Sequence, residues 1–224
     1  MIARATRDLA PGTELTWWYQ VPTADDHAQR KTRLLRHWGF ACDCALCEDE
    51  QTTSAAVRAK RESLAAGLER CLASLGRGQD EDGEGEEAVR VVVARIETVV
   101  EAMAATYRRP ANEVPRLAIW EAMQKPLMAV VGMKQVQPMR MVKLLLGAFA
   151  SLGYVIEGGM SGTIVVREWG LMVGGVVAAW VLLRDIYRLA APELVVPTEG
   201  YAKTAYRMVF GEDETFESYG EGQM

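Results

Sequence analysis

The sequence carries no excess of positive charge. Its 224 residues include 25 lysines and arginines against 30 aspartates and glutamates, and the formal net charge is −5. Domains that bind nucleic acid usually present a basic face to the phosphate backbone. The charge balance therefore argues against direct nucleic-acid binding.

Long apolar segments are missing as well. The first twelve residues, "MIARATRDLAPG", are polar and interrupted, so no secretory segment is visible. The most apolar stretch, Leu171–Leu183, is bracketed by Arg167, Glu168, Arg184 and Asp185. It is shorter than the roughly 20 apolar residues that a membrane span requires. We expect a buried helix there and no contact with a membrane.

Cysteines are scarce, and their distribution is uneven. Three of the four, Cys42, Cys44 and Cys47, form a CxCxxC motif, whereas Cys71 stands alone. Without a signal peptide, the chain is expected in a reducing compartment, where disulfides are rare. A disulfide within CxCxxC would also close a very small, strained loop. The motif therefore favours metal ligation.

Zinc is the metal that this pattern predicts. Thiolates hold zinc tetrahedrally, and CxCxxC places three of them around one tight turn that has few apolar residues of its own. The alternative is three incidental thiols in a loop. A structural zinc needs a fourth ligand, and neither neighbour is a strong candidate. His37 ends a predicted helix, where it suits a cap-region cation, and Cys71 lies on an apolar helical face. The pattern indicates a site completed by a group from elsewhere.

The N-terminal fifth of the chain predicts a small mixed module. Residues 1–6 and 14–19 have strand composition, and Pro11–Gly12 marks a turn between them. Residues 23–39 predict one helix, with Thr23 as N-cap and with Arg36 and His37 in the last turn. The cysteines follow directly.

Beyond residue 50 the patterns are helical, and the fold class is mainly α. Helical spacing of apolar residues covers 54–76, 86–107, 114–132, 138–159, 163–190 and 198–211. The glycine-acid run at 76–87 cannot contribute to a core, and we expect a flexible loop. Antiparallel helices with short loops are the economical packing for such a series. Several segments have the length of a tetratricopeptide helix, although no period near 34 residues is visible.

Aromatic and methionine residues of this region are spaced like core residues. They are Trp120, Met123, Met128, Met133, Met139, Met141, Trp169 and Met172. We expect most of them to pack in the core. The alternative role, lining a groove that binds a peptide, stays open because stacked helix pairs form concave surfaces.

Residues 3–47 resemble a known family. The motif consists of Gly12-x-Glu14-Leu15-Thr16-x-x-Tyr19, then a helix ending in "LLRHWGF", then Cys42-x-Cys44-x-x-Cys47. This order and spacing are similar to the second half of a SET domain followed by its post-SET zinc knuckle. The closest likeness is to the protein-lysine methyltransferases that combine SET and MYND modules with a tetratricopeptide-like helical domain. On this basis we expect residues 1–50 to form the SET remnant and knuckle, and residues 51–224 the helical domain.

The resemblance implies an S-adenosylmethionine-dependent protein-lysine N-methyltransferase. By likeness, the Tyr19 hydroxyl orients the lysine amine, Phe40 packs on the adenine of the cofactor, and Trp38 lines the lysine channel. Cys42, Cys44 and Cys47 would share a zinc ion with a fourth cysteine from the SET core. Read without the family, Tyr19 is an ordinary strand aromatic, and Trp38 and Phe40 are hydrophobic anchors of the knuckle.

Other parts of the family pattern do not occur in the sequence. It contains no Asn-His-x-x-x-Pro-Asn segment, no early glycine-rich cofactor strand and no MYND cysteine cluster. We therefore expect an N-terminally truncated form with little activity on its own. Its partner would be a protein lysine, on a histone or another protein, in the nucleus or the cytoplasm. The alternative function is a non-catalytic helical scaffold that carries a vestigial SET and zinc remnant.

Overall fold

The structure is a computed structural model that describes residues 10–12, 27–75, 84–131, 137–160, 162–212 and 214–221. Within these residues the chain is mainly α-helical, as the sequence predicts, with one antiparallel pair of strands. The helices are α1 (His27–Trp38), α2 (Ala45–Thr52), α3 (Ala55–Leu75), α4 (Glu84–Ala104), α5 (Leu117–Val131), α6 (Pro138–Ser151), α7 (Val176–Ala190), α8 (Val195–Phe210) and α9 (Phe216–Glu221). The strands are β1 (Val155–Gly158) and β2 (Ile164–Glu168), and a short 3-10 helix spans Pro192–Leu194. The turn expected at Pro11–Gly12 is present, whereas the two expected N-terminal strands lie outside the described residues.

Helix α1 follows the charge pattern of its sequence. The helix predicted over residues 23–39 is confirmed in its described part, from His27 to Trp38. Arg36 and His37 occupy its last turn, where positive charge is favourable against the helix dipole. Gly39 then adopts a φ of 75° and donates its N–H to the Leu35 carbonyl over 3.1 Å. Glycine adopts this left-handed conformation readily, so the helix ends just before the cysteines.

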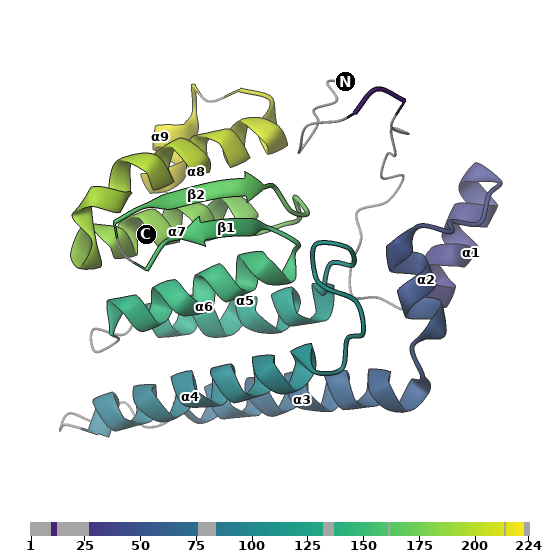
Figure 1. The fold of residues 1–224 in the computed structure, drawn as a ribbon. Helices are drawn as coiled ribbons and strands as arrows, with labels where there is room; N and C mark the ends of the chain where they lie inside the picture. Colours follow the sequence, from purple (N-terminus) through teal and green to yellow (C-terminus); the bar gives the residue numbers. More distant parts are fainter. Residues whose placement is uncertain are drawn as a thin grey trace.

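The remaining long helices form a layered antiparallel array (Figure 1). Helices α3 and α4 lie side by side, and α5 packs on both of them. Helix α6 then packs on α5, α7 on α6, and α8 on α7. The expected antiparallel packing is therefore confirmed. The tetratricopeptide-like character of the array and a domain division after residue 50 stay predictions, and that division would fall inside α2.

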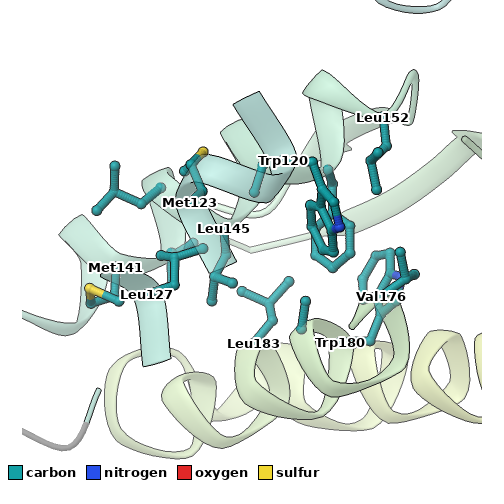
Figure 2. Close-up of a cluster of buried hydrophobic side chains, with 14 of the residues drawn as sticks. Trp120, Met123, Leu127, Met141, Leu145, Leu152, Val176, Trp180 and Leu183 are labelled. Atoms are coloured by element: carbon teal, nitrogen blue, oxygen red, sulfur yellow. The ribbon is translucent and has the colours of Figure 1, made fainter. Parts of the chain in front are cut away.

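One hydrophobic core runs through this array (Figure 2). Phe149 of α6 stacks on Trp180 of α7 with ring centroids 4.3 Å apart, and Trp120 of α5 contacts Phe149 at 6.4 Å. The core residues predicted from spacing are fully buried at Trp120, Met123 and Met141, and half-buried at Met139, Trp169 and Met172. The side chains of Met128 and Met133 lie outside the described residues. Packing is thus the role of those predicted core residues that the structure describes.

A β-hairpin interrupts two of the predicted helices, and this corrects the sequence interpretation. The helical pattern over 138–159 ends at Ser151, and the pattern over 163–190 becomes helical only at Val176. Between them, β1 and β2 pair antiparallel, with Ile156 opposite Val166 and Gly158 opposite Ile164. Both strands are rich in β-branched residues, which favour extended structure.

Glycines and two tyrosine hydroxyls hold the hairpin in place. Gly153, Gly158 and Gly159 adopt φ values between 77° and 89°, which residues with a Cβ rarely reach. The Tyr187 hydroxyl donates to the Gly159 carbonyl over 2.5 Å. The Tyr201 hydroxyl accepts from the Val166 N–H over 3.3 Å. Tyr187 belongs to α7 and Tyr201 to α8, both well after the hairpin in the chain, so the local spacing of apolar residues did not predict this arrangement.

The loop predicted in the acidic run is shorter than expected. The loop predicted over residues 76–87 is wrong for its last four residues, because α4 begins at Glu84. Glutamate is a good helix former, and this segment leads directly into the buried residues Val92, Val93 and Ile96. Residues 76–83 lie outside the described part of the chain.

The most apolar segment of the sequence forms part of the core. From Val176 onward it is helical, and Val176, Trp180 and Leu183 are fully buried. The helical prediction is wrong for residues 171–175, which form a loop and turn that contain two glycines. Among the described helices, none combines the length and apolar character needed to cross a membrane.

The hairpin glycines yield a matched pair of stability predictions. A Cβ at Gly158 would overlap the Thr163 carbonyl oxygen at a φ of 77°, so Gly158→Ala should lower the free energy of unfolding by about 2 kcal/mol. A Cβ at Gly147, in the middle of α6, has no heavy atom within 4 Å, so Gly147→Ala should raise that free energy by about 0.5–1 kcal/mol. Urea unfolding monitored by circular dichroism measures both. Equal effects of the two substitutions would contradict the hairpin geometry.

Candidate metal centre

Three sulfur atoms converge where α1 leads into α2; the segment that joins the two helices and the first turn of α2 are here together called the cysteine turn (residues 39–47). The Sγ atoms of Cys42, Cys44 and Cys47 all lie within 4.8 Å of one another. Two sulfurs bound to one tetrahedral zinc stand about 3.8 Å apart, given a Zn–S bond of about 2.3 Å. A small inward movement of these sulfurs would produce that spacing. In the described part of the chain this is the one cluster of at least three metal-ligating side chains.

The local backbone explains why the sulfurs meet. Gly39 redirects the chain at the end of α1, and Cys44 is extended (φ −62°, ψ 160°) as the N-cap of α2. Its carbonyl accepts the Glu48 N–H over 3.0 Å, which starts the helix. Cys47 therefore lies in the first turn of α2, next to the positive end of the helix dipole.

The thiol electrostatics fit a bound dication. Burial, together with the neighbouring thiols of Cys44 and Cys42, raises the pKa of Cys47 to about 12. Burial also opposes ionisation of Cys44, but the backbone amides of Cys47 and Leu46 and the adjacent thiols outweigh it, so the Cys44 pKa is lowered. Three adjacent thiolates repel one another unless a cation lies between them. The donor set is the soft, anionic type that zinc accepts.

Helix α2 is attached on its other sides to both of its neighbours. Glu50 forms an ion pair with Arg30 of α1, and both side chains are largely buried. Glu48 pairs with Arg109 over 3.3 Å, and Leu46 packs against the core of the helical array. The helix that carries Cys47 is thus fastened to α1 and to the array.

The other predicted site residues flank the cysteine turn. Trp38, at the end of α1, is 55% exposed, and Phe40 is half-buried just before Cys42. His37 is exposed, and Cys71 is half-buried against the array core, so neither joins the sulfur cluster. Tyr19, the predicted catalytic residue, lies outside the described residues together with Trp17 and Trp18. The roles of Tyr19, Trp38 and Phe40 stay predictions.

A cavity of about 850 Å³ adjoins α2, and the sequence did not reveal it. Its walls come from α2, from α3, from α5 and from the loop after α4, so residues far apart in the chain line it. On the loop side, the Arg61 guanidinium lies 3.5 Å from the centroid of the Tyr107 ring and donates to Thr106 Oγ1 over 2.8 Å. Burial raises the pKa of the Tyr107 hydroxyl. No pattern within one segment could have indicated this cavity.

Comparison with known proteins supports a relation to methyltransferases. In an alignment 223 residues long that covers 96% of the chain, it is 32% identical to a protein of Gibberella zeae named a methyltransferase, and it spans 28% of that relative. It is also 46% identical over 46 residues, 20% of the chain, to proteins named histone-lysine N-methyltransferase SET5 from Candida albicans and Meyerozyma guilliermondii. Those alignments span 10% and 9% of the two relatives.

Two further comparisons found nothing similar. No protein-family model matches the chain, and no solved structure matches it. The likeness to methyltransferases expected from the motif is therefore confirmed at the level of sequence similarity. The SET and MYND branch, the post-SET assignment and the tetratricopeptide-like domain stay predictions.

The sulfur cluster predicts a metal dependence that can be measured directly. The purified chain should hold zinc, and Cys47→Ser should weaken zinc binding by more than about 100-fold, because it removes a direct ligand. The melting temperature should fall with it, since metal binding contributes to folding. Metal analysis by mass spectrometry and calorimetric melting give both readouts.

The control for this experiment is Cys71→Ser, which changes a thiol outside the cluster. It should leave zinc content unchanged. A metal-free protein, or a Cys47→Ser variant with unaltered zinc content and melting, would contradict the metal centre.

Proposed function

We propose that this chain is part of an S-adenosylmethionine-dependent protein-lysine N-methyltransferase of the SET family. In this proposal residues 1–50 contribute the second half of the catalytic domain and its zinc knuckle. The observation that carries the proposal is the CxCxxC motif with its three converged sulfurs, directly after a segment of SET-like sequence. The similarity to a protein named a methyltransferase over 96% of the chain supports it.

The metal would act structurally. Cys42, Cys44 and Cys47 would hold zinc, and a fourth ligand from outside the cluster would complete a closed tetrahedral site. With no open coordination position, such a site supplies folding energy and takes no part in the reaction. In this chain the bound zinc would fix the position of Phe40, which precedes Cys42 by two residues, at the edge of the metal centre.

The transferred group would come from S-adenosylmethionine, whose sulfonium carries an activated methyl group. The half-buried Phe40 ring offers a face on which the adenine can stack. The Tyr19 hydroxyl would accept a hydrogen bond from the lysine amine and orient its lone pair toward the methyl carbon. Trp38 would border the lysine channel and exclude water from it.

The substrate in this proposal is a lysine side chain on a protein. The two relatives named histone-lysine N-methyltransferases favour a histone and a nuclear location. Because the chain spans 28% of the Gibberella zeae relative, the proposal concerns the whole enzyme to which such a segment belongs.

A non-catalytic scaffold is the second candidate function, and the cavity beside α2 favours it. At about 850 Å³ it is large enough to receive several side chains of a bound peptide. A scaffold would bind its partner without Tyr19, whereas methyl transfer requires that hydroxyl. Substitution of Tyr19 therefore distinguishes the two functions, because it would abolish methyl transfer but not the binding of a partner.

The role of Tyr19 can be tested in a chimera. Residues 1–224 would replace the aligned segment of the Gibberella zeae relative, and the product would be assayed with tritiated S-adenosylmethionine and core histones. If the segment is equivalent, the chimera retains the relative's activity, and Tyr19→Phe lowers kcat about 100-fold or more. Tyr107→Phe, which removes a hydroxyl in the adjoining cavity, is the control and should leave kcat within about twofold. A folded, zinc-loaded but inactive chimera of an active relative would contradict the proposal.

Phe40 should act on cofactor affinity. In the same chimera, Phe40→Ala should raise the KM for S-adenosylmethionine about tenfold, since stacking of a base on an aromatic ring contributes about 1–3 kcal/mol. The KM for the histone should stay within about twofold. Phe40→Trp keeps a stacking face and should restore most of the cofactor affinity. An unchanged cofactor KM in Phe40→Ala would remove Phe40 from the cofactor site.

A further inference from the structure

The cysteine turn has little structure of its own, so its shape depends on the helices at its ends. Residues 39–44 form no helix or strand, and they connect the end of α1 at Trp38 to the start of α2 at Ala45. Cys42 and Cys44 belong to this connection, whereas Cys47 belongs to α2. The distance between the two sets of sulfurs therefore follows the placement of α1 relative to α2.

A buried ion pair joins the two helices. The Arg30 guanidinium of α1 contacts the Glu50 carboxylate of α2, and their side chains are 6% and 20% exposed. Glu50 follows Cys47 by three residues, so the two side chains lie one turn apart on the same face of α2. The ion pair therefore lies one helical turn from a metal ligand.

Other contacts hold α2 but do not replace this link. Leu46 packs against the array core and Glu48 pairs with Arg109, and neither of these contacts involves α1. On the side of α1, the buried residues are Arg30 and Leu34, four residues apart on one face. Leu34 is outside the array core. A buried ion pair is costly to desolvate, and where it is retained it can select one arrangement of the elements that carry it.

We infer that Arg30 and Glu50 are positioning residues for the metal centre: their ion pair holds α1 against α2 so that Cys42 and Cys44 stay within reach of the ion that Cys47 binds. This inference rests on the metal centre of the proposed function. Neither residue is itself a ligand in this arrangement. Residues that orient metal ligands from behind typically change affinity 10- to 100-fold when they are removed.

The experiment measures metal affinity and geometry in the full 224-residue chain. Zinc affinity is determined by competition with a chromophoric chelator, and cobalt(II) substitution reports geometry through its d–d and thiolate charge-transfer bands. Glu50→Gln should weaken zinc binding 10- to 100-fold and alter the cobalt spectrum, while the bound stoichiometry at saturation stays unchanged. Arg30→Met should have a similar effect.

The matched control is Glu48→Gln, which makes the same chemical change two residues away on α2. Glu48 is 67% exposed in its pair with Arg109, so this variant should keep zinc affinity within about twofold and the wild-type cobalt spectrum. In the double variant Glu50→Gln with Arg30→Met, the two losses should be less than additive, because both changes break one interaction. Conservation of charge in Glu50→Asp should recover part of the affinity.

The possible failures can be told apart. If the wild-type chain binds zinc and Glu50→Gln matches Glu48→Gln in affinity and in cobalt spectrum, the positioning role is overturned while the metal centre stands. If the wild-type chain binds no metal, both the centre and the positioning role are overturned. Far-ultraviolet circular dichroism identifies a variant that has lost its helices. If Glu50→Gln has lost its helices, Arg30→Met is compared with Glu48→Gln instead, and equal zinc affinities of these two variants would overturn the positioning role.

Discussion

The close approach of three sulfur atoms is the constraint around which the N-terminal part of the described structure is organised. Cys42, Cys44 and Cys47 lie within 4.8 Å of one another, and burial raises the pKa of Cys47 to about 12. Without a cation, the three thiols cannot all ionise at that spacing. The glycine turn after α1, the N-cap at Cys44 and the ion pair behind Cys47 together keep the sulfurs in an arrangement that suits a dication. The chemistry of the donor set and the geometry of the backbone thus point to the same metal.

The helical array needs no metal to hold it together, because its stability comes from the burial of apolar side chains. Its core extends from Leu68 on α3 to Phe216 on α9 and includes the stacked rings of Phe149 and Trp180, and neither Cys47 nor Leu34 belongs to it. Helix α2 connects the two parts of the molecule, since Leu46 reaches the array core while Cys47 faces the other sulfurs. The cavity lies where these parts meet.

Local patterns in the sequence predicted the features that short-range physics controls. Helix α1 and its end at Gly39 follow from charge placement and from the backbone freedom of glycine. Helix α3 follows from apolar spacing, and the convergence of the sulfurs follows from CxCxxC. The β-hairpin was missed because Val155, Ile156 and Ile164–Val166 lie between segments with true helical periodicity, and hydroxyls of distant tyrosines hold it. The start of α4 was missed because an acidic composition alone does not distinguish a loop from a helix that begins with glutamates.

By itself the sequence determined the mainly helical class, the position of the metal-binding motif and the likeness to methyltransferases. Each of these depends on residue types at fixed short separations, which survive in any fold that the chain adopts. Tertiary structure alone decided that Arg30 is buried against Glu50 and that α2 joins the cysteine turn to the array. It also decided that α2, α3 and α5 together line a cavity. These features arise because side chains far apart in the sequence pack against one another. The periodicity of one segment carries no information about which distant segment will pack on it.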